Sequence, residues 1–255
     1  MEGTSPDVSS PELQKLAQAL RSIPEGPEPL YCLLLTGSLN PVHRMHVSIF
    51  DLAKRHLEST FPGMMVVAGW ISPSHDQYVS HKLGHDFIPG SARLTMCRLA
   101  VAQHPWVSAS AWETEQSGFV DFPECTERMQ QWLKLQFPRR NLKVLFICGA
   151  DHAVRCHIVP PHHRRFGVVC LTRDGKEDEI KRQMGRFGVT EGTGPAPFFL
   201  VPGEPAAVSS TEVRCRLLRG EPMGDLLHPD VEQWLRRFWD ETHPKLPEVP
   251  TEIPK

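Results

Sequence analysis

Two histidines three residues apart follow an apolar run that ends in a glycine–serine turn. The stretch reads YCLLLTGSLNPVHRMH over residues 31–46 and places the rings at His43 and His46. If a helix begins after the turn, both rings lie on one face of its first turn. A helix N-terminus presents free N–H groups and a partial positive charge, which together bind phosphate. The alternative is structural, with one histidine capping the helix and the other a half-buried surface ring.

A second stretch of the same kind lies near the C-terminal end of the chain. It reads VSSTEVR over residues 208–214, and Thr211 and Arg214 are again three residues apart. An inward arginine beside a hydroxyl-rich first turn suits a polyphosphate, because guanidinium groups donate several hydrogen bonds to phosphate oxygens. Ser209 and Glu212 also match a capping box, so this stretch alone equally describes a well-capped surface helix. Two such helix starts in one chain favour a phosphate site.

Alternating strands and helices are needed to position these two stretches. Apolar runs predict strands at residues 31–36, 65–71, 107–112, 143–148, 167–172 and 198–201. Helical periodicity predicts helices at 42–57, at 91–103 with a cap at Ser91, at 126–137, from 209 to a stop at Gly220, and from Pro229 onward. Several strands are continuously apolar, as in parallel sheets buried on both faces. The pattern predicts an α/β fold with a Rossmann-like doubly wound parallel sheet, whose ligands bind at the carboxyl ends of the strands.

The two ends of the chain differ from this pattern. Residues 1–29 and 240–255 are rich in proline and polar residues, and they predict an N-terminal tail and a disordered C-terminal tail around a single domain at 30–239. A short packed helix is expected inside the first tail, because Ser10 and Pro11 form a helix start signal. Its apolar residues share one face: Leu13, Leu16, Ala17 and Leu20.

The overall composition argues against several classes of function. The chain has 28 Lys and Arg against 30 Asp and Glu, a formal net charge of −2, and no basic block. Neither nucleic acid nor a membrane is therefore expected as a partner. The seven cysteines include no C-x-x-C pair, and no secretory leader pattern is visible, which together predict a cytoplasmic or nuclear protein with reduced thiols. The cysteines and histidines between residues 148 and 163 fit no compact zinc pattern, so no metal site is predicted.

The two phosphate-suited stretches also resemble a known pair of motifs. TGSLNPVHRMH resembles the GSFNPxHxxH signature of the nucleotidylyltransferase superfamily, and VSSTEVR resembles its ISSTxxR motif. Five further stretches resemble the eukaryotic-type nicotinamide/nicotinate mononucleotide adenylyltransferases in order and rough spacing. They are ISPSHDQY (71–78), IPGSARLTM (88–96), WVSASAWE (106–113), GAD (149–151) and CLTRDG (170–175). The resemblance covers about residues 31–238 and implies a fold of the nucleotidylyltransferase type.

The resemblance implies an enzyme of NAD biosynthesis. It would transfer AMP from ATP to nicotinamide or nicotinate mononucleotide and release pyrophosphate, with Mg²⁺ arriving with ATP. The implied catalytic residues are His43, His46 and Arg214. The implied ATP-binding residues are Gly37, Ser38, Gly149, Asp151, Ser210, Thr211 and Arg214, and the implied mononucleotide-binding residues are Lys82, Trp112 and Arg173. Members of this family commonly assemble as oligomers, so a homo-oligomer is compatible with the resemblance.

The sequence departs from the family pattern in three places. Leu39 replaces the usual phenylalanine, and the stretch around Lys82 is longer than the usual basic run. The segment between Asp151 and the next strand, residues 152–166, is short, contains Pro160–Pro161, which would end any helix, and lacks the second tryptophan that relatives carry near the nicotinamide. These departures leave two alternatives open. One is nucleotidyl transfer to a different phosphate-bearing acceptor, and the other is a repurposed member that binds or hydrolyses ATP in a regulatory role.

Overall fold

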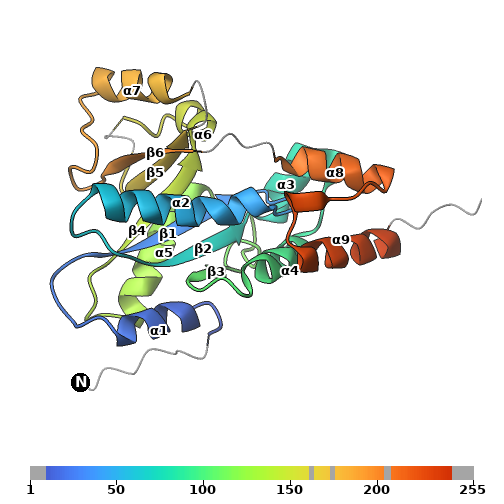
Figure 1. Ribbon diagram of the computed structural model, residues 1–255, viewed down its shortest axis with the longest axis horizontal. Helices are drawn as coiled ribbons and strands as arrows, with labels where there is room; N and C mark the ends of the chain where they lie inside the picture. The colour runs from blue at the N-terminus through green and yellow to red at the C-terminus, as the bar shows by residue number, and fades with distance from the viewer. Residues whose placement is uncertain (1–9, 161–163, 173–175, 204–207, 243–255) are drawn as a thin grey trace, which may run out of the picture.

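A single parallel sheet forms the centre of the computed structural model, which describes residues 10–160, 164–172, 176–203 and 208–242. Helices cover both faces of the sheet (Figure 1). The strands are β1 (Leu30–Gly37), β2 (Val66–Pro73), β3 (Val107–Ala109), β4 (Leu142–Gly149), β5 (Gly167–Thr172) and β6 (Phe198–Pro202). The helices are α1 (Gln14–Arg21), α2 (Arg44–Thr60), α3 (Asp76–Leu83), α4 (Gly90–Val101), α5 (Phe122–Gln136), α6 (Ala150–Arg155), α7 (Glu177–Arg186), α8 (Ser210–Arg219) and α9 (Pro229–Thr242). All six predicted strands are present, and the predicted doubly wound α/β sheet is confirmed.

The strand order places a ligand site between β1 and β4. The sheet runs β3-β2-β1-β4-β5-β6, so the chain leaves β1 toward one edge and later returns to its other side. Strands β1 and β4 pair directly, with Leu33 opposite Leu145 and Leu34 opposite Phe146. Ligands of open α/β sheets bind beyond the carboxyl ends of the strands at such a reversal. The Gly37–Ser38 turn after β1 and the β4–α6 junction at Gly149 both lie at this edge.

Alternate strand residues face two separate apolar layers. Leu33, Leu145 and Val169 belong to the layer that packs against α2, α4, α8 and α9. On the opposite face, Leu34 packs with residues of α1 and α5, and Cys170 packs with residues of α6 and α7. Because both faces are covered, the strands need apolar residues at successive positions, which explains their continuous apolar runs.

The predicted end of β3 and the predicted cap of α4 are wrong. Strand β3 ends at Ala109 rather than at residue 112, because the backbone N–H of Ala111 turns away from the sheet to the carboxylate of Glu12 at 2.8 Å. Helix α4 begins at Gly90 with Pro89 in the cap position, so Ser91 is not its cap. A side chain at Gly90 would bring its Cβ within 2.7 Å of Asp76 Oδ1, which explains the glycine there.

Two further helix starts can be compared with the sequence predictions. Helix α5 begins at Phe122, earlier than the predicted residue 126, because Asp121 Oδ1 accepts the Phe122 N–H at 2.8 Å. Helix α8 begins and ends as predicted: Ser209 accepts the Glu212 N–H at 3.1 Å, and Gly220 closes the helix at φ +67°. Helices α3, α6 and α7 were not predicted. Helices α3 and α6 are short, and α7 contains few apolar residues.

The predicted N-terminal helix is confirmed as α1. It begins at Gln14 with Leu13 in the cap position, not at Pro11 with Ser10 as the cap. Leu13, Leu16 and Leu20 are buried in the same apolar layer as residues of β2 and α5. Helix α9 extends through Thr242. None of the helices in the described ranges is both long and apolar enough to cross a bilayer.

Candidate active site

The turn after β1 is held from three sides and leaves open space at Gly37. The Ser74 N–H donates to the Gly37 carbonyl at 2.8 Å, and Arg93 Nη1 donates to the Ser38 carbonyl at 2.9 Å. Lys82 Nζ donates to Ser38 Oγ at 3.3 Å. A Cβ placed on Gly37 would meet no heavy atom within 4 Å. A ligand can therefore approach this backbone closely without displacing protein atoms.

The two histidine rings stack on each other at the start of α2. Their ring centroids are 3.6 Å apart with an interplanar angle of 23°, which confirms the predicted common face. The structural alternative also holds in part, because His43 occupies the N-cap position of α2. The His43 backbone N–H donates to Nδ1 of His46 at 3.1 Å. Because Nδ1 accepts this bond, the proton of a neutral His46 ring lies on Nε2 and makes that nitrogen a donor.

The first turn of α8 is bound to the loop that enters α2. Ser210 Oγ donates to the Pro41 carbonyl at 2.8 Å, and Arg214 Nη1 donates to the Asn40 carbonyl at 2.8 Å. Arg214 is buried as predicted, its Nε lies 3.2 Å from Asp86 Oδ2, and its Nη2 lies 3.5 Å from Thr211 Oγ1. These contacts bring the N-termini of α2 and α8 to the same end of the sheet (Figure 1).

Arg93 and Asn40 support this loop and were not predicted as site residues. The Arg93 side chain is fully buried and donates to the Ile88 carbonyl at 2.8 Å and to Asp76 Oδ1 at 2.6 Å, in addition to Ser38. Burial lowers the pKa of the Arg93 guanidinium, and the Asp76 carboxylate partly opposes that change. Asn40 accepts the Ile88 N–H at 2.8 Å through its side-chain oxygen. Both residues lie within matched motif stretches, but only the spatial contacts reveal their role.

Lys82 lies beside the phosphate-suited turn despite the lengthened sequence around it. Helix α3 places its Nζ at Ser38 Oγ and 5.6 Å from the centre of the Tyr78 ring. The Tyr78 ring in turn stacks on Phe119, with centroids 4.8 Å apart and an angle of 18°. Lys82, which the resemblance implies as a mononucleotide-binding residue, therefore lies at the Gly37–Ser38 turn.

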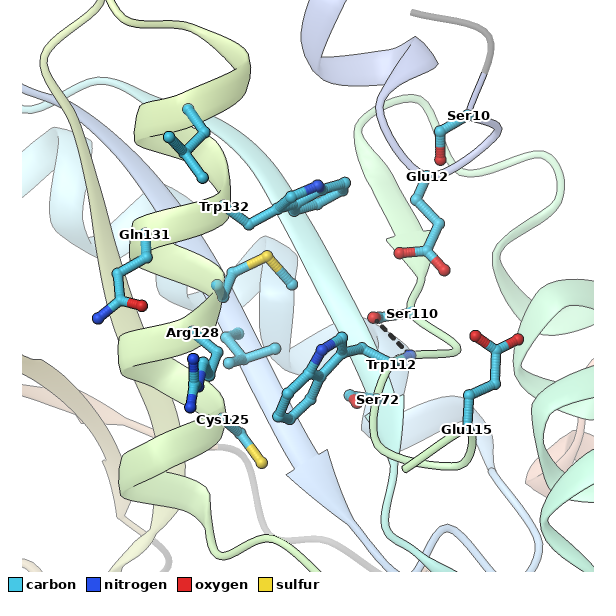
Figure 2. Close-up of a pocket in the computed structure, with 13 residues that line it drawn as sticks. Ser10, Glu12, Ser72, Ser110, Trp112, Glu115, Cys125, Arg128, Gln131 and Trp132 are labelled. Atoms are coloured by element: carbon cyan, nitrogen blue, oxygen red, sulfur yellow. Dashed lines mark hydrogen bonds between the residues drawn. The ribbon is translucent and has the colours of Figure 1, made fainter. Parts of the chain in front are cut away.

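Trp112 lines a pocket of about 420 Å³ on the α1–α5 face of the sheet (Figure 2). Its other walls include Trp132 and Met129 of α5, Glu12 before α1, and Ser72 at the end of β2. Ser72 pairs with Thr36, which directly precedes the Gly37–Ser38 turn. The pocket therefore adjoins the carboxyl ends of β1 and β2, close to the turn that suits phosphate.

The site residues predicted after β4 and β5 are Gly149, Asp151 and Arg173. Gly149 is the cap residue of α6, and a Cβ on it would meet no heavy atom within 4 Å. Asp151 is exposed and lies 3.5 Å from Lys176 Nζ, next to the start of α7. Arg173 lies outside the described residues. The backbone of Gly149 at the end of β4 is therefore accessible to a ligand, whereas the Asp151 carboxylate faces a lysine.

A match to a protein-family sequence model, which covers most of the chain, identifies the family. The sequence model of the cytidylyltransferase-like family matches residues 34–216, from β1 through the first turns of α8. The chain belongs to the cytidylyltransferase-like family. This membership confirms the resemblance of its two phosphate-suited motifs to the nucleotidylyltransferases.

Relatives of this cytidylyltransferase-like chain carry related names. The nicotinamide/nicotinic acid mononucleotide adenylyltransferase of Arabidopsis thaliana is 30% identical over 157 residues, which are 58% of this chain and 63% of the relative. The protein of the same name from Oryza sativa is 30% identical over 158 residues, 58% and 61% of the two chains. The chain thus spans less than two thirds of the length of either relative.

A solved structure supports the fold of this family member. The chain matches Plasmodium falciparum nicotinic acid mononucleotide adenylyltransferase complexed with NaAD at a TM-score of 0.53. Sequence identity is 14%, and the match covers 82% of this chain and 96% of the other. At that identity the similarity concerns the fold alone.

Glu113, next to Trp112, is a buried carboxyl group in this cytidylyltransferase-like chain. It is 2% exposed, and burial raises its pKa from 4.5 to about 7. Hydrogen bonds from the side chains of Ser72, Cys125 and Ser74, and the charge of Arg93, oppose this rise. Near neutral pH the group is therefore close to half protonated, which places a titrating carboxyl beside the Trp112 pocket.

Glu113→Gln is expected to change how stability depends on pH. Between pH 4.5 and about 7 the folded protein holds a proton on Glu113 that the unfolded chain releases, so the wild type loses stability as pH rises. The variant lacks this loss. The difference in free energy of unfolding, variant minus wild type, should therefore increase by about 2 kcal/mol from about pH 5 to about pH 8. Urea unfolding of both proteins at the two pH values measures this difference, and parallel pH profiles would contradict it.

Proposed function

We propose that the protein transfers AMP from ATP to the 5′-phosphate of nicotinamide or nicotinate mononucleotide, which yields the dinucleotide and pyrophosphate. The observation that carries the proposal is the binding of the first turn of α8 to Asn40 and Pro41, which lie between the open Gly37–Ser38 turn and the N-terminus of α2. Lys82 and Arg214 add positive charge there, and a triphosphate is the ligand that such a concentration of donors suits. The activity named in the plant relatives supports the choice of acceptor.

In this proposal the triphosphate of ATP lies over Gly37 and Ser38. An oxygen of the acceptor phosphate attacks the α-phosphorus of ATP, and the bond from the α-phosphorus to the bridging oxygen of the β-phosphate breaks as pyrophosphate leaves. His46 donates from Nε2 to a phosphate oxygen, and Lys82 and Arg214 offset negative charge. Because such transfers depend on positioning and charge stabilisation, no protein nucleophile is needed.

Mg²⁺ enters this scheme as part of the ATP substrate. Within the described ranges, no group of three or more His, Cys, Asp or Glu residues is arranged to hold a metal ion. Mg²⁺ bound to a nucleotide is usually held mainly by phosphate oxygens and water. Asp76 and Asp86 are paired with Arg93 and Arg214, the two arginines that donate to the Ser38 and Asn40 carbonyls.

The acceptor has two chemical parts, a phosphate and a pyridine ring, and each has its own proposed binding residue. Its phosphate would be bound near Lys82, and its pyridine ring would stack on Trp112, whose pocket adjoins the same turn. A cytoplasmic or nuclear location and homo-oligomeric assembly remain predictions from the sequence.

The test is an acceptor panel with purified protein and Mg–ATP. Nicotinamide mononucleotide, nicotinate mononucleotide and unrelated phosphate monoesters are supplied separately, and dinucleotide and pyrophosphate are quantified. The proposal expects dinucleotide from at least one pyridine mononucleotide. Pyrophosphate release with only an unrelated phosphate ester would indicate a different acceptor, and ADP with orthophosphate would indicate an ATP-hydrolysing member of the family. Either result would overturn the proposed acceptor or reaction.

Gly37→Val is expected to weaken ATP binding without unfolding the protein. The new side chain extends into the open space proposed for the triphosphate and meets no protein atom at its Cβ. The dissociation constant for Mg–ATP should rise by roughly tenfold or more, since crowding of this kind costs about 1–3 kcal/mol. Calorimetric titration measures the constant, and thermal unfolding checks the fold.

The matched control is Gly185→Val on α7, where a Cβ also meets nothing within 4 Å. Its ATP affinity should equal that of the wild type. Equal affinity in Gly37→Val and wild type would place the triphosphate elsewhere.

A further inference from the structure

We infer that Glu12, in the segment before β1, is a positioning residue that fixes Trp112 for the base of the acceptor. The inference rests on the proposed function, because that function assigns the base to the Trp112 pocket. Glu12 lies outside the residues that the family model matches, which begin at residue 34. It therefore extends the pocket beyond the part of the chain that the family defines.

The contacts of Glu12 join the N-terminal segment to the ends of β2 and β3. Its carboxylate accepts the Ala111 N–H at 2.8 Å, and its backbone carbonyl accepts the Trp70 Nε1–H at 3.0 Å. Ala111 is 5% exposed and directly precedes Trp112. A buried backbone N–H requires an acceptor, and Glu12 supplies it from a distance of 99 residues in the sequence.

Ser110 extends this connection to Trp112 itself. Its Oγ accepts the Trp112 N–H at 3.3 Å (Figure 2), and its side chain lowers the pKa of the neighbouring Glu12 carboxylate. The rest of the turn is closed locally, by Thr114 Oγ1 donating to the Ala111 carbonyl at 2.8 Å and Gln116 Nε2 donating to the Trp112 carbonyl at 2.7 Å. Glu12 ties this turn to the N-terminal segment.

The Glu12 carboxylate is partly buried where it contacts the turn. Desolvation raises the pKa of Glu12, and the hydrogen bond from the Ala111 N–H opposes part of that rise. Figure 2 shows the Glu12 carboxylate facing the Ser110–Trp112 bend, across the pocket from Gln131 and Trp132 of α5. The Trp112 ring therefore lies between α5 on one side and a turn held by Glu12 on the other.

A second anchor of the same segment supplies a matched control. Lys15 Nζ donates to the Val101 and Val107 carbonyls at 2.7 and 2.6 Å, at the end of α4 and the start of β3. Lys15→Met would loosen α1 without removing a partner of the Trp112 turn. Comparing it with Glu12 variants separates positioning of Trp112 from general loss of stability.

The test combines kinetics with hydrogen exchange on full-length protein. In Glu12→Ala, KM for the pyridine mononucleotide should rise about fivefold to tenfold, while kcat and KM for ATP change less than about twofold. Backbone amide exchange in residues 110–116 of the ligand-free protein should accelerate about tenfold or more. Glu12→Gln keeps an acceptor oxygen and should restore both values to near wild type. Ser110→Ala, which leaves the N-terminal segment intact, should change both in the same direction as Glu12→Ala.

Lys15→Met should lower the melting temperature and leave KM for the mononucleotide unchanged. The inference is overturned if Glu12→Ala raises that KM no more than Lys15→Met, or if exchange at residues 110–116 does not accelerate. A wild-type protein that forms no dinucleotide would refute the proposed function instead. The exchange comparison uses no substrate, so it would still decide whether Glu12 fixes the Trp112 turn.

Discussion

His46→Ala is expected to lower kcat for dinucleotide formation by about 10²–10³-fold, the usual effect of removing one donor to transition-state charge. His46 stacks on His43 at the N-terminus of α2, and its Nδ1 accepts the His43 N–H, so its Nε2 is the donor nitrogen. Steady-state kinetics with saturating Mg–ATP and mononucleotide measure the effect. The binding of ATP should change much less than kcat, because the turn and the other cations remain.

His46→Gln distinguishes chemistry from helix capping. Glutamine is a common third residue of a capping box, and its side-chain oxygen can accept the His43 N–H that Nδ1 accepts in the wild type. The variant should therefore unfold at nearly the wild-type temperature and still show the loss in kcat. Full activity in His46→Gln would mean that the reaction does not require the imidazole ring of His46.

Arg93→Met is expected to lower the free energy of unfolding by about 1–3 kcal/mol, the usual effect of leaving a buried hydrogen-bond acceptor without its donor. The variant leaves the Asp76 carboxylate without its 2.6 Å partner and removes the donors to the Ser38 and Ile88 carbonyls. Because Ser38 belongs to the phosphate-suited turn, ATP affinity should fall as well. Urea unfolding and calorimetric titration measure the two effects.

Arg98→Met is the matched control for this prediction. Arg98 lies on the same helix, α4, and is exposed, so its replacement should change the free energy of unfolding by less than about 0.5 kcal/mol. Equal stabilities of the two variants would show that the Arg93 network does not stabilise the fold.

The sheet could be predicted from sequence because its strands are short apolar runs between helical patterns. The face shared by His43 and His46 could also be predicted, because it depends only on helical spacing. The end of β3 could not. It is decided by the Ala111 N–H, whose acceptor is Glu12, 99 residues away in the sequence. Local propensity carries no information about such a partner.

The supporting residues of the site show the same limit. Arg93 and Asn40 lie in motif stretches, yet their roles arise from contacts with Ser38, Ile88 and Arg214, which come from separate elements. Lys82 illustrates the reverse case, since its sequence context departs from the family pattern. The orientation of α3 nevertheless brings its Nζ to Ser38 Oγ. Spatial placement by a helix can preserve a contact when local spacing changes.

Phosphorus NMR of one reaction tests adenylyl transfer most directly. The mixture contains purified protein, Mg–ATP and a pyridine mononucleotide. We expect the mononucleotide phosphate signal to decline while the signals of the dinucleotide and of inorganic pyrophosphate grow in equal amounts. Formation of ADP and orthophosphate with an unchanged mononucleotide signal would contradict the account.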